Sequence, residues 1–168
     1  MQKTNIIAGW SEKVLDFITL LNRVRERLKG LLQIIGGNIM DKFILLTSMM
    51  FLHIVDDFYL QGILAKLKQR KFWEENAPQK LYKCDYIIAL IIHAFSWCFM
   101  VHIPLFVWAF IKCVEYPAYM LMSTFICNTA IHAYVDDFKA NKLKINLVTD
   151  QTIHFMQIIL TFFIYMAI

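Results

Sequence analysis

The sequence predicts an all-α integral membrane protein, a bundle of about four membrane-spanning helices preceded by an N-terminal amphipathic helix. The chain of 168 residues is 59% hydrophobic, and its mean hydropathy is +0.52. An ordinary soluble domain is only roughly 45–50% apolar. Several apolar runs are also long enough to cross a bilayer as helices, which takes about 20 residues. Composition and run length together favour a membrane bundle over a soluble one.

The charge pattern points to the same class of protein. The formal net charge of +4 comes mainly from lysines and arginines between the apolar runs. In a membrane protein such charges set the orientation and attract anionic lipids. No nucleic-acid motif is present, so the lipid bilayer is the expected partner. We divide the chain into an N-terminal segment, residues 1–40, and a transmembrane domain, residues 41–168.

The N-terminal segment shows helical periodicity over residues 6–35. Apolar side chains recur at steps of three and four from Val14 to Ile35, and charged side chains fill the remaining arc. This pattern predicts an amphipathic helix with a basic polar face, which Gly36 and Gly37 would end. Two interpretations stay open, because such a helix can lie in the membrane interface or assemble a homo-oligomer.

Four apolar segments are the expected membrane spans. They cover residues 41–65, 85–111, 118–138 and 149–168. Proline lacks a backbone N–H, so Pro104 marks either a kink in the second span or its end. In this topology the basic connections, residues 66–83 and 139–144, share one side of the membrane. We take that side to be cytoplasmic because both connections are short and basic.

Ionisable residues interrupt these apolar segments at a regular spacing. Residues four apart in a helix lie on one face. Three such pairs occur in the first, third and fourth spans: His53/Asp57, His132/Asp136 and Asp150/His154. An ionisable side chain within the bilayer costs about 2.5 kcal/mol or more, so such residues usually face the protein interior and carry function.

The order within each pair follows the direction of its span. Histidine precedes aspartate in the first and third spans, whereas aspartate precedes histidine in the fourth, which runs the opposite way. Each aspartate therefore lies nearer the basic connections and each histidine lies deeper. His93 in the second span falls at a similar depth, at about 1.5 Å per helical residue. The sequence thus predicts a layer of four histidines beside three carboxylates.

This layer suits a divalent metal ion, because neutral imidazole and carboxylate groups bind zinc, manganese and iron. We expect zinc first, with manganese or iron as alternatives. The predicted metal ligands are His53, Asp57, His93, His132, Asp136, Asp150 and His154. The paired spacing is similar in logic to the Glu-x-x-His pairs of di-metal bundles. Seven side chains are enough for one ion with supporting acids or for two ions.

A metal ion in this layer would support hydrolysis, because it can lower the pKa of a bound water to about 7. Asp57 and Asp136 are the candidate catalytic residues, since an aspartate that does not bind the ion can act as a general base. We therefore expect a metal-dependent hydrolase of a lipid or another membrane-soluble substrate. Of the doublet Asp56 and Asp57, the four-residue spacing from His53 favours Asp57.

Other interpretations of these residues stay open. Asp150 can simply cap the fourth span, Asp136 can be a solvated interfacial charge, and His93 can be a hydrogen-bonded core histidine. His102 is expected near the membrane interface. The whole layer can also relay protons or pass a metal ion, as in a transporter or channel. It can equally be a structural layer in an oligomeric membrane effector.

Four segments within residues 43–168 carry a family resemblance. They are residues 53–61, His93, residues 132–136 and residues 150–154. In these segments the chain resembles a bacterial and phage membrane family catalogued as domain of unknown function 3307. The resemblance implies a small multi-pass protein of a bacterial cell membrane, or of a host membrane if a phage encodes it. It implies no activity, and Asp56 replaces the small residue expected there.

Overall fold

The computed structural model describes residues 18–28, 30 and 38–167, and these residues contain helices and no strand. The predicted all-α class is therefore confirmed. The elements after residue 37 are α2 (Asn38–Ile54), the π-helix η1 (Val55–Leu60), α3 (Leu64–Leu67), α4 (Arg70–Asn76), the 3-10 helix η2 (Lys80–Tyr82), α5 (Asp85–Lys112), α6 (Ala118–Ala140) and α7 (Leu147–Met166).

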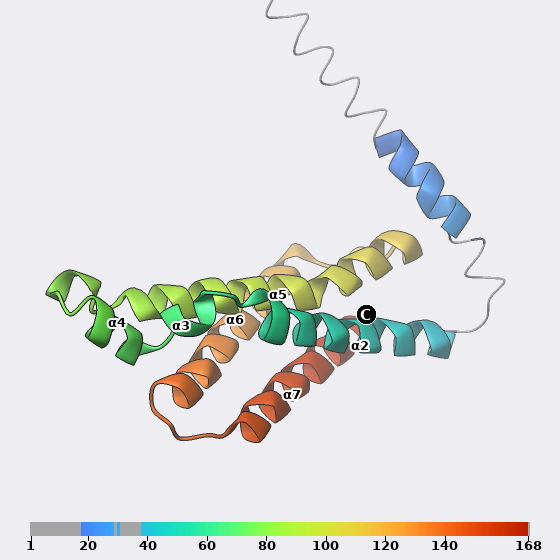
Figure 1. Ribbon diagram of the computed structural model, residues 1–168. Coiled ribbons are helices and arrows are strands. Elements are labelled where there is room, and N and C mark those ends of the chain that lie inside the picture. The colour runs from blue at the N-terminus through green and yellow to red at the C-terminus, as the bar shows by residue number, and fades with distance from the viewer. Residues whose placement is uncertain (1–17, 29, 31–37, 168) are drawn as a thin grey trace, which may run out of the picture.

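Helices α2, α5, α6 and α7 form a four-helix bundle (Figure 1). Helix α5 packs against α2 and α6, and α7 packs against the other sides of α6 and α2, so the four helices enclose a common interior. The short helices α3 and α4 lie beside the start of α5, at the same end of the bundle as the α6–α7 connection (Figure 1). We call this the basic end, after residues 66–83 and 139–144.

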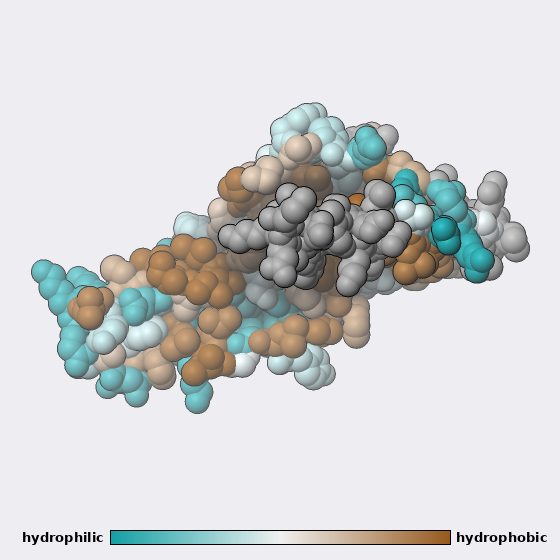
Figure 2. Space-filling view, turned by 90° about the horizontal axis from the view of Figure 1, so that it is seen from above, coloured by the Kyte–Doolittle hydropathy of each residue, from teal (hydrophilic) through white to brown (hydrophobic). Residues whose placement is uncertain are grey.

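Three helical segments are long and apolar enough to cross a membrane. They are Ile39–Leu60, Lys80–Lys112 and Leu147–Met166. Figure 2 shows apolar side chains, in brown, along much of one face and hydrophilic side chains, in teal, gathered toward both ends. Helix α6 has 23 residues and nearly the predicted bounds, but its polar side chains keep it out of the apolar set. The span predicted over residues 118–138, which corresponds to α6, therefore stays a prediction.

The interior of the bundle has two halves. The half remote from the basic end is an apolar core in which Trp97, Val101, Leu105 and Ile158 are all 0% exposed. Val101, Leu105 and Ile158 come from the second halves of α5 and α7, and Trp97 lies near the middle of α5. Both helices begin at the basic end and run away from it, so their second halves lie at the same remote end of the bundle. The other half, toward the basic end, is filled by the histidines and aspartates described below.

The first apolar segment differs from the predicted range of residues 41–65. Helix α2 passes into the π-helix η1, and the helical run ends before Gly62, whose φ of +50° is a left-handed conformation that glycine adopts readily. A π-helix is frequent at functional sites. The wider turn brings both Asp56 and Asp57 into the interior, with side chains 2% and 4% exposed. The four-residue spacing thus singles out Asp57 without excluding Asp56.

Two expectations concern the second apolar segment, one for Pro104 and one for His102. Helix α5 continues through Pro104 to Lys112, so this proline does not end the span. The expectation that His102 is interfacial is wrong, because its side chain is 0% exposed in the core. The His102 Nδ1–H donates to the carbonyl oxygen of Cys98 at 2.7 Å, which supplies a local partner for a buried imidazole.

The predicted amphipathic helix is described only in part. Residues 18–28 are helical, and the rest of the predicted range apart from residue 30 lies outside the described residues. Arg25 joins this helix to the end of α5, since its Nε donates to Cys113 Sγ at 2.8 Å and its guanidinium lies 5.4 Å from the Phe110 ring centroid. The apolar side chains of Ile18 and Leu20 are exposed, as a helix at a membrane surface would have them.

Candidate metal centre

Four histidines from four elements meet inside the bundle near its basic end. His53 of α2, His93 of α5, His132 of α6 and His154 of α7 are each at most 1% exposed. The rings of His132 and His154 stack with centroids 4.0 Å apart, and His93 lies 5.1 Å from His132. His53 lies 5.8 Å from His154. The structure therefore brings together the histidine layer that the sequence predicts.

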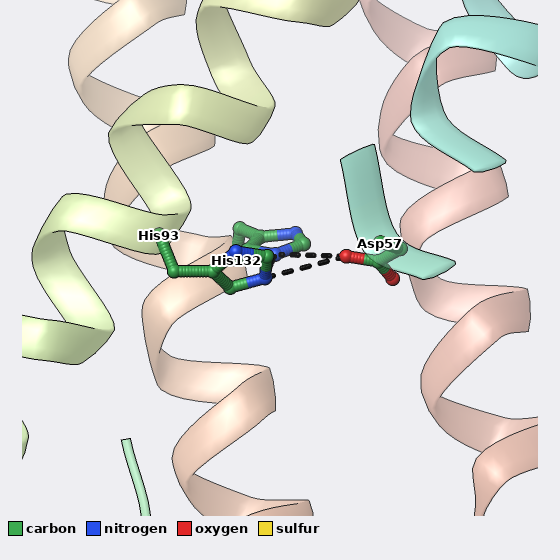
Figure 3. A group of neighbouring side chains, drawn as sticks. All are labelled: Asp57, His93 and His132. Carbon is green, nitrogen blue, oxygen red and sulfur yellow. Dashed lines mark hydrogen bonds and ion pairs between the residues drawn. The ribbon is translucent and has the colours of Figure 1, made fainter. Parts of the chain in front are cut away.

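Asp57 faces two of these imidazoles. Its Oδ1 lies 3.3 Å from His93 Nε2 and 3.8 Å from His132 Nε2. Figure 3 shows the Asp57 carboxylate pointing from η1 toward the imidazoles of α5 and α6. The other oxygen, Oδ2, accepts a hydrogen bond from Gln151 Nε2 at 2.9 Å, which fixes the orientation of the carboxylate.

A second carboxylate, Asp136, lies on the other side of the histidines. Its Oδ2 is 3.4 Å from His93 Nε2 and its Oδ1 is 3.6 Å from His154 Nε2. Asp136 is 2% exposed, so it is not the solvated interfacial charge that the sequence left open. That description fits its neighbour Asp137, whose side chain is 20% exposed and pairs with Lys142 at 3.0 Å.

Two groups of three side chains place their ligand atoms within 4.8 Å of one another. They are Asp57, His93 and His132, and then His132, Asp136 and His154. Tetrahedral zinc with bonds of about 2.0–2.1 Å separates its ligand atoms by about 3.3 Å. The Nε2 atoms of His93 and His132 are 3.2 Å apart. The separations around His93 therefore match a zinc site closely, and the group can hold a metal ion.

His53 lies beside these groups and its ring is fully hydrogen-bonded. Its Nδ1 accepts from Trp97 Nε1 at 2.6 Å, so the ring proton resides on Nε2, which donates to Gln151 Oε1 at 3.0 Å. No lone pair of His53 is left for a metal ion. The contacts assign this predicted ligand to orienting Trp97 and Gln151 instead.

Asp150 also lies beside the two groups. Its Oδ2 is 2.5 Å from Lys139 Nζ, and its Oδ1 is 3.4 Å from His154 Nε2. It is 0% exposed and is not the helix cap, because Asn146 caps α7 by accepting from the Thr149 N–H. Of the seven predicted ligands, the structure thus places five in the two groups and leaves His53 and Asp150 at their edge.

Some residues of the site were not predicted from the sequence. Lys68 follows α3, is 8% exposed and places its Nζ 2.5 Å from Asp136 Oδ2. Ser96 Oγ donates to Asp56 Oδ1 at 2.8 Å. Ser96 and Trp97 follow His93 by three and four residues, so helical spacing could have placed them on the same face. No comparable signal distinguishes Lys68 from the other lysines of its hydrophilic segment.

The charges of this buried cluster do not balance. Four carboxylates, from Asp56, Asp57, Asp136 and Asp150, face the two ammonium groups of Lys68 and Lys139. With neutral imidazoles the cluster therefore carries two unbalanced negative charges. Buried charges are stable only when they are paired or bind metal ions. One divalent cation, or two protons, would balance the cluster.

Several buried polar atoms of the described part of the chain lie in this cluster without a hydrogen-bond partner, and others, such as His102 Nε2 and Thr129 Oγ1, lie elsewhere in the bundle. Among the described residues, His132 Nδ1, His154 Nε2 and Asp150 Oδ1 are buried and have no hydrogen-bond partner. A buried polar atom left in this state costs about 1–3 kcal/mol. Two of the three, on His154 and Asp150, lie 3.4 Å apart and so face a common point. The donor set and its unmet contacts fit a bound cation.

A polar seam runs from the cluster along the α6–α7 interface. His154 Nδ1 is 3.2 Å from Gln157 Oε1, and Gln157 Nε2 donates to the Asn128 carbonyl oxygen at 3.3 Å. Asn128 Nδ2 in turn donates to Thr161 Oγ1 at 2.8 Å. Asn128, one of the polar residues that lower the hydropathy of α6, is therefore paired inside the bundle.

Comparison with family models, with curated proteins and with solved structures finds no match. Three apolar helices and a buried His/Asp cluster that can hold a metal ion fit a membrane protein with a polar intramembrane site.

Proposed function

We propose that this protein holds one divalent metal ion, zinc first, between Asp57, His93 and His132, and uses it to hydrolyse a membrane-soluble substrate. The observation that carries the proposal is a buried ligand group whose atoms lie at metal-binding distances, in a cluster rich in carboxylates. A zinc site with three protein ligands and an open fourth position is typical of catalytic centres.

Asp136 is the general base in this proposal. Its Oδ2 is 3.4 Å from His93 Nε2, so it borders the ligand group without being one of the three ligands. In hydrolysis the water oxygen bonds to the acyl or phosphoryl centre while Asp136 accepts the proton of that water. The bond to the leaving oxygen breaks, and that oxygen takes up a proton. His154 Nε2 lies 3.6 Å from Asp136 and helps to hold this carboxylate in place, and Lys68, on the connection after α3, pairs with it.

The membrane setting belongs to the same proposal. Helix α6 also crosses the membrane, as the third of four spans, because Asn128, His132 and Asp136 are buried whereas Met122 and Ile126 face outward, 62% and 61% exposed. A bilayer would thus contact an apolar surface. The resemblance noted above supports placement in a bacterial cell membrane or, for a phage protein, in the host membrane. Assembly into a homo-oligomer through the N-terminal helix also stays a proposal.

Lipid turnover tests the hydrolase. Wild-type protein, Asp136→Asn and Asp137→Asn are reconstituted in liposomes of bacterial polar lipids, with zinc or after metal removal, and products are followed by mass spectrometry. We expect products only with zinc, a rate lower by about 10²–10⁴-fold in Asp136→Asn, as for loss of a general base, and no change in Asp137→Asn. Zinc-loaded wild-type protein that leaves every lipid class intact would contradict hydrolysis.

One observation favours a second function, a proton pathway. His154 Nε2 lies between two carboxylate oxygens, 3.6 Å from Asp136 and 3.4 Å from Asp150, which is a setting for an imidazolium ion. Two protons would balance the cluster as well as one metal ion. The polar seam leads from His154 toward the opposite end of the bundle. Proton flux in metal-free liposomes, read with an internal pH dye, would favour this function over hydrolysis.

A further inference from the structure

We propose that the substrate is an anionic lipid that carries a phosphate group, and that the ammonium group of Lys68 receives this phosphate beside the metal ion. The inference rests on the proposed metal site and extends it to a substrate class. Its starting point is a lysine that reaches from outside the bundle to the edge of the ligand group.

Lys68 occupies the border of the ligand group. Its Nζ lies 2.5 Å from Asp136 Oδ2, and the same oxygen is 3.4 Å from His93 Nε2. The Lys68 side chain is only 10% exposed, although its backbone belongs to a hydrophilic connection. Taking an ammonium group out of water is costly, so such lysines usually carry function. The cation therefore borders the place where a substrate bound to the metal ion would lie.

The chain around Lys68 is fixed to the end of α6. Asn141 Nδ2 donates to the Lys68 carbonyl oxygen at 3.1 Å, and the Arg70 N–H donates to Asn141 Oδ1 at 2.7 Å. Trp73 Nε1 donates to the Leu67 carbonyl oxygen at 2.7 Å. These bonds hold the backbone, while the four-carbon side chain of Lys68 can turn from Asp136 to a neighbouring anion.

The surface outside Lys68 suits anionic headgroups. A groove of about 200 Å³ beside α4 and η2 is lined by the cationic side chains of Arg70, Lys80 and Lys83 and by Glu74, which pairs with Arg70 at 2.8 Å. The Trp73 ring, also in its wall, stacks on Tyr82 at 6.2 Å, and tryptophan and tyrosine are typical of the membrane–water interface. Basic residues at a membrane surface concentrate anionic lipids. The basic end would therefore concentrate the proposed substrate beside the connection that carries Lys68.

The depth of the site also fits a headgroup. Helix α5 has 28 residues, so it is about 42 Å long and spans the hydrocarbon core together with both headgroup regions. His93 lies eight residues after Asp85, which places it about 12 Å from the basic end of the helix. A headgroup region takes up about 5–7 Å of this distance. A phosphate group thus needs only a short inward movement to meet Lys68.

The charge of Lys68 distinguishes an anionic substrate from a neutral one. A neutral ester lipid offers the ammonium group no counterion, whereas a phosphate oxygen accepts a charge-assisted hydrogen bond. Binding a phosphate would also free Asp136 from Lys68, so that the carboxylate can accept a proton from water. One residue thereby links substrate recognition to the base.

Binding of short-chain lipids to the zinc-loaded full chain in detergent tests this inference. The probes are dihexanoyl phosphatidic acid, dihexanoyl glycerol and inorganic phosphate, each followed by titration calorimetry. We expect phosphatidic acid to bind, and dihexanoyl glycerol and inorganic phosphate to bind at least about tenfold more weakly, since only the first offers both charge and chains. Equal affinity for inorganic phosphate, or for the neutral lipid, would overturn the inference.

Matched lysine variants test whether the affinity for phosphatidic acid depends on Lys68. Lys68→Gln should weaken phosphatidic acid binding by about tenfold or more, as expected for a lost charge-assisted hydrogen bond. Lys71→Gln is the control, because Lys71 lies on the same connection, 80% exposed, and should change nothing. Zinc content is measured in each sample. Protein without zinc refutes the proposed metal site, whereas zinc-loaded Lys68→Gln with unchanged lipid affinity refutes only the role of Lys68.

Discussion

Replacing Asp136 with asparagine is expected to lower the free energy of unfolding of the metal-free protein by about 3–5 kcal/mol, the usual result of breaking a buried ion pair from one side. The variant leaves the Lys68 ammonium group buried without its partner at 2.5 Å. It also removes the carboxylate that His93 and His154 face at 3.4 Å and 3.6 Å. Chemical unfolding in detergent micelles, followed by circular dichroism, measures this change.

Two further variants make the expectation specific. Asp137→Asn is the neighbouring control, because its partner Lys142 is 44% exposed and an exposed pair contributes only about 0–1 kcal/mol. The double variant Asp136→Asn/Lys68→Met removes both charges and should recover much of the lost stability. Equal stability of Asp136→Asn and Asp137→Asn would show that Lys68 and Asp136 do not form a buried ion pair in the folded protein.

The second large effect concerns His132, which both ligand groups share. His132→Ala should weaken zinc binding by at least about a hundredfold, since even residues that only support metal ligands account for about 10–100-fold in affinity. The imidazole also packs against the rings of Trp97, at 4.2 Å, and His154, at 4.0 Å, so two aromatic neighbours help to set its position. Competition with a fluorescent zinc chelator gives the affinity.

The control for this experiment is His102→Ala. His102 is also 0% exposed, but it lies outside both ligand groups and bonds to its own helix. Its removal leaves a similar cavity, so any loss of fold should resemble that in His132→Ala while zinc affinity is retained. Equal zinc affinity in the two variants would show that His132 is not a ligand.

The helices and their shared polar layer could be predicted from the sequence because both depend on local patterns. Apolar run length places α5 and α6 within a few residues of their observed ends, Asp85–Lys112 and Ala118–Ala140. The four-residue spacing and the direction of each span bring histidines from four helices to one depth. Periodic spacing is a reliable guide here because residues four apart share one helix face, and each helix buries one face in the bundle.

The remaining features of the site depend on long-range contacts that leave no local signal. Lys68 reaches Asp136 across 68 residues of sequence, and the hydrogen bonds of Asn141 tie that connection to the end of α6. The π-helix that admits Asp56 beside Asp57 breaks the regular spacing on which the prediction relied. His53 shows that correct placement does not fix a role, since Trp97 and Gln151 occupy both of its ring nitrogens.

For His102 the predicted location itself was wrong. Its place near the far end of an apolar segment favoured the membrane interface. Helix α5 instead continues for eight residues beyond Pro104, so His102 lies well inside a helix of 28 residues. Its ring packs 5.4 Å from that of Phe125 and 5.9 Å from that of Tyr165. Burial at this position depends on α6 and α7, which its own sequence neighbourhood does not reveal.

The metal content of the wild-type protein tests the central claim most directly. The chain is purified in detergent, supplied with zinc, manganese or iron, separated from unbound ions, and analysed by mass spectrometry for metal per chain. The charge of the cluster and the shared His132 predict about one divalent ion per chain, zinc in preference to the others. No bound metal under any of these conditions would contradict the metal centre and leave protons to balance the buried carboxylates.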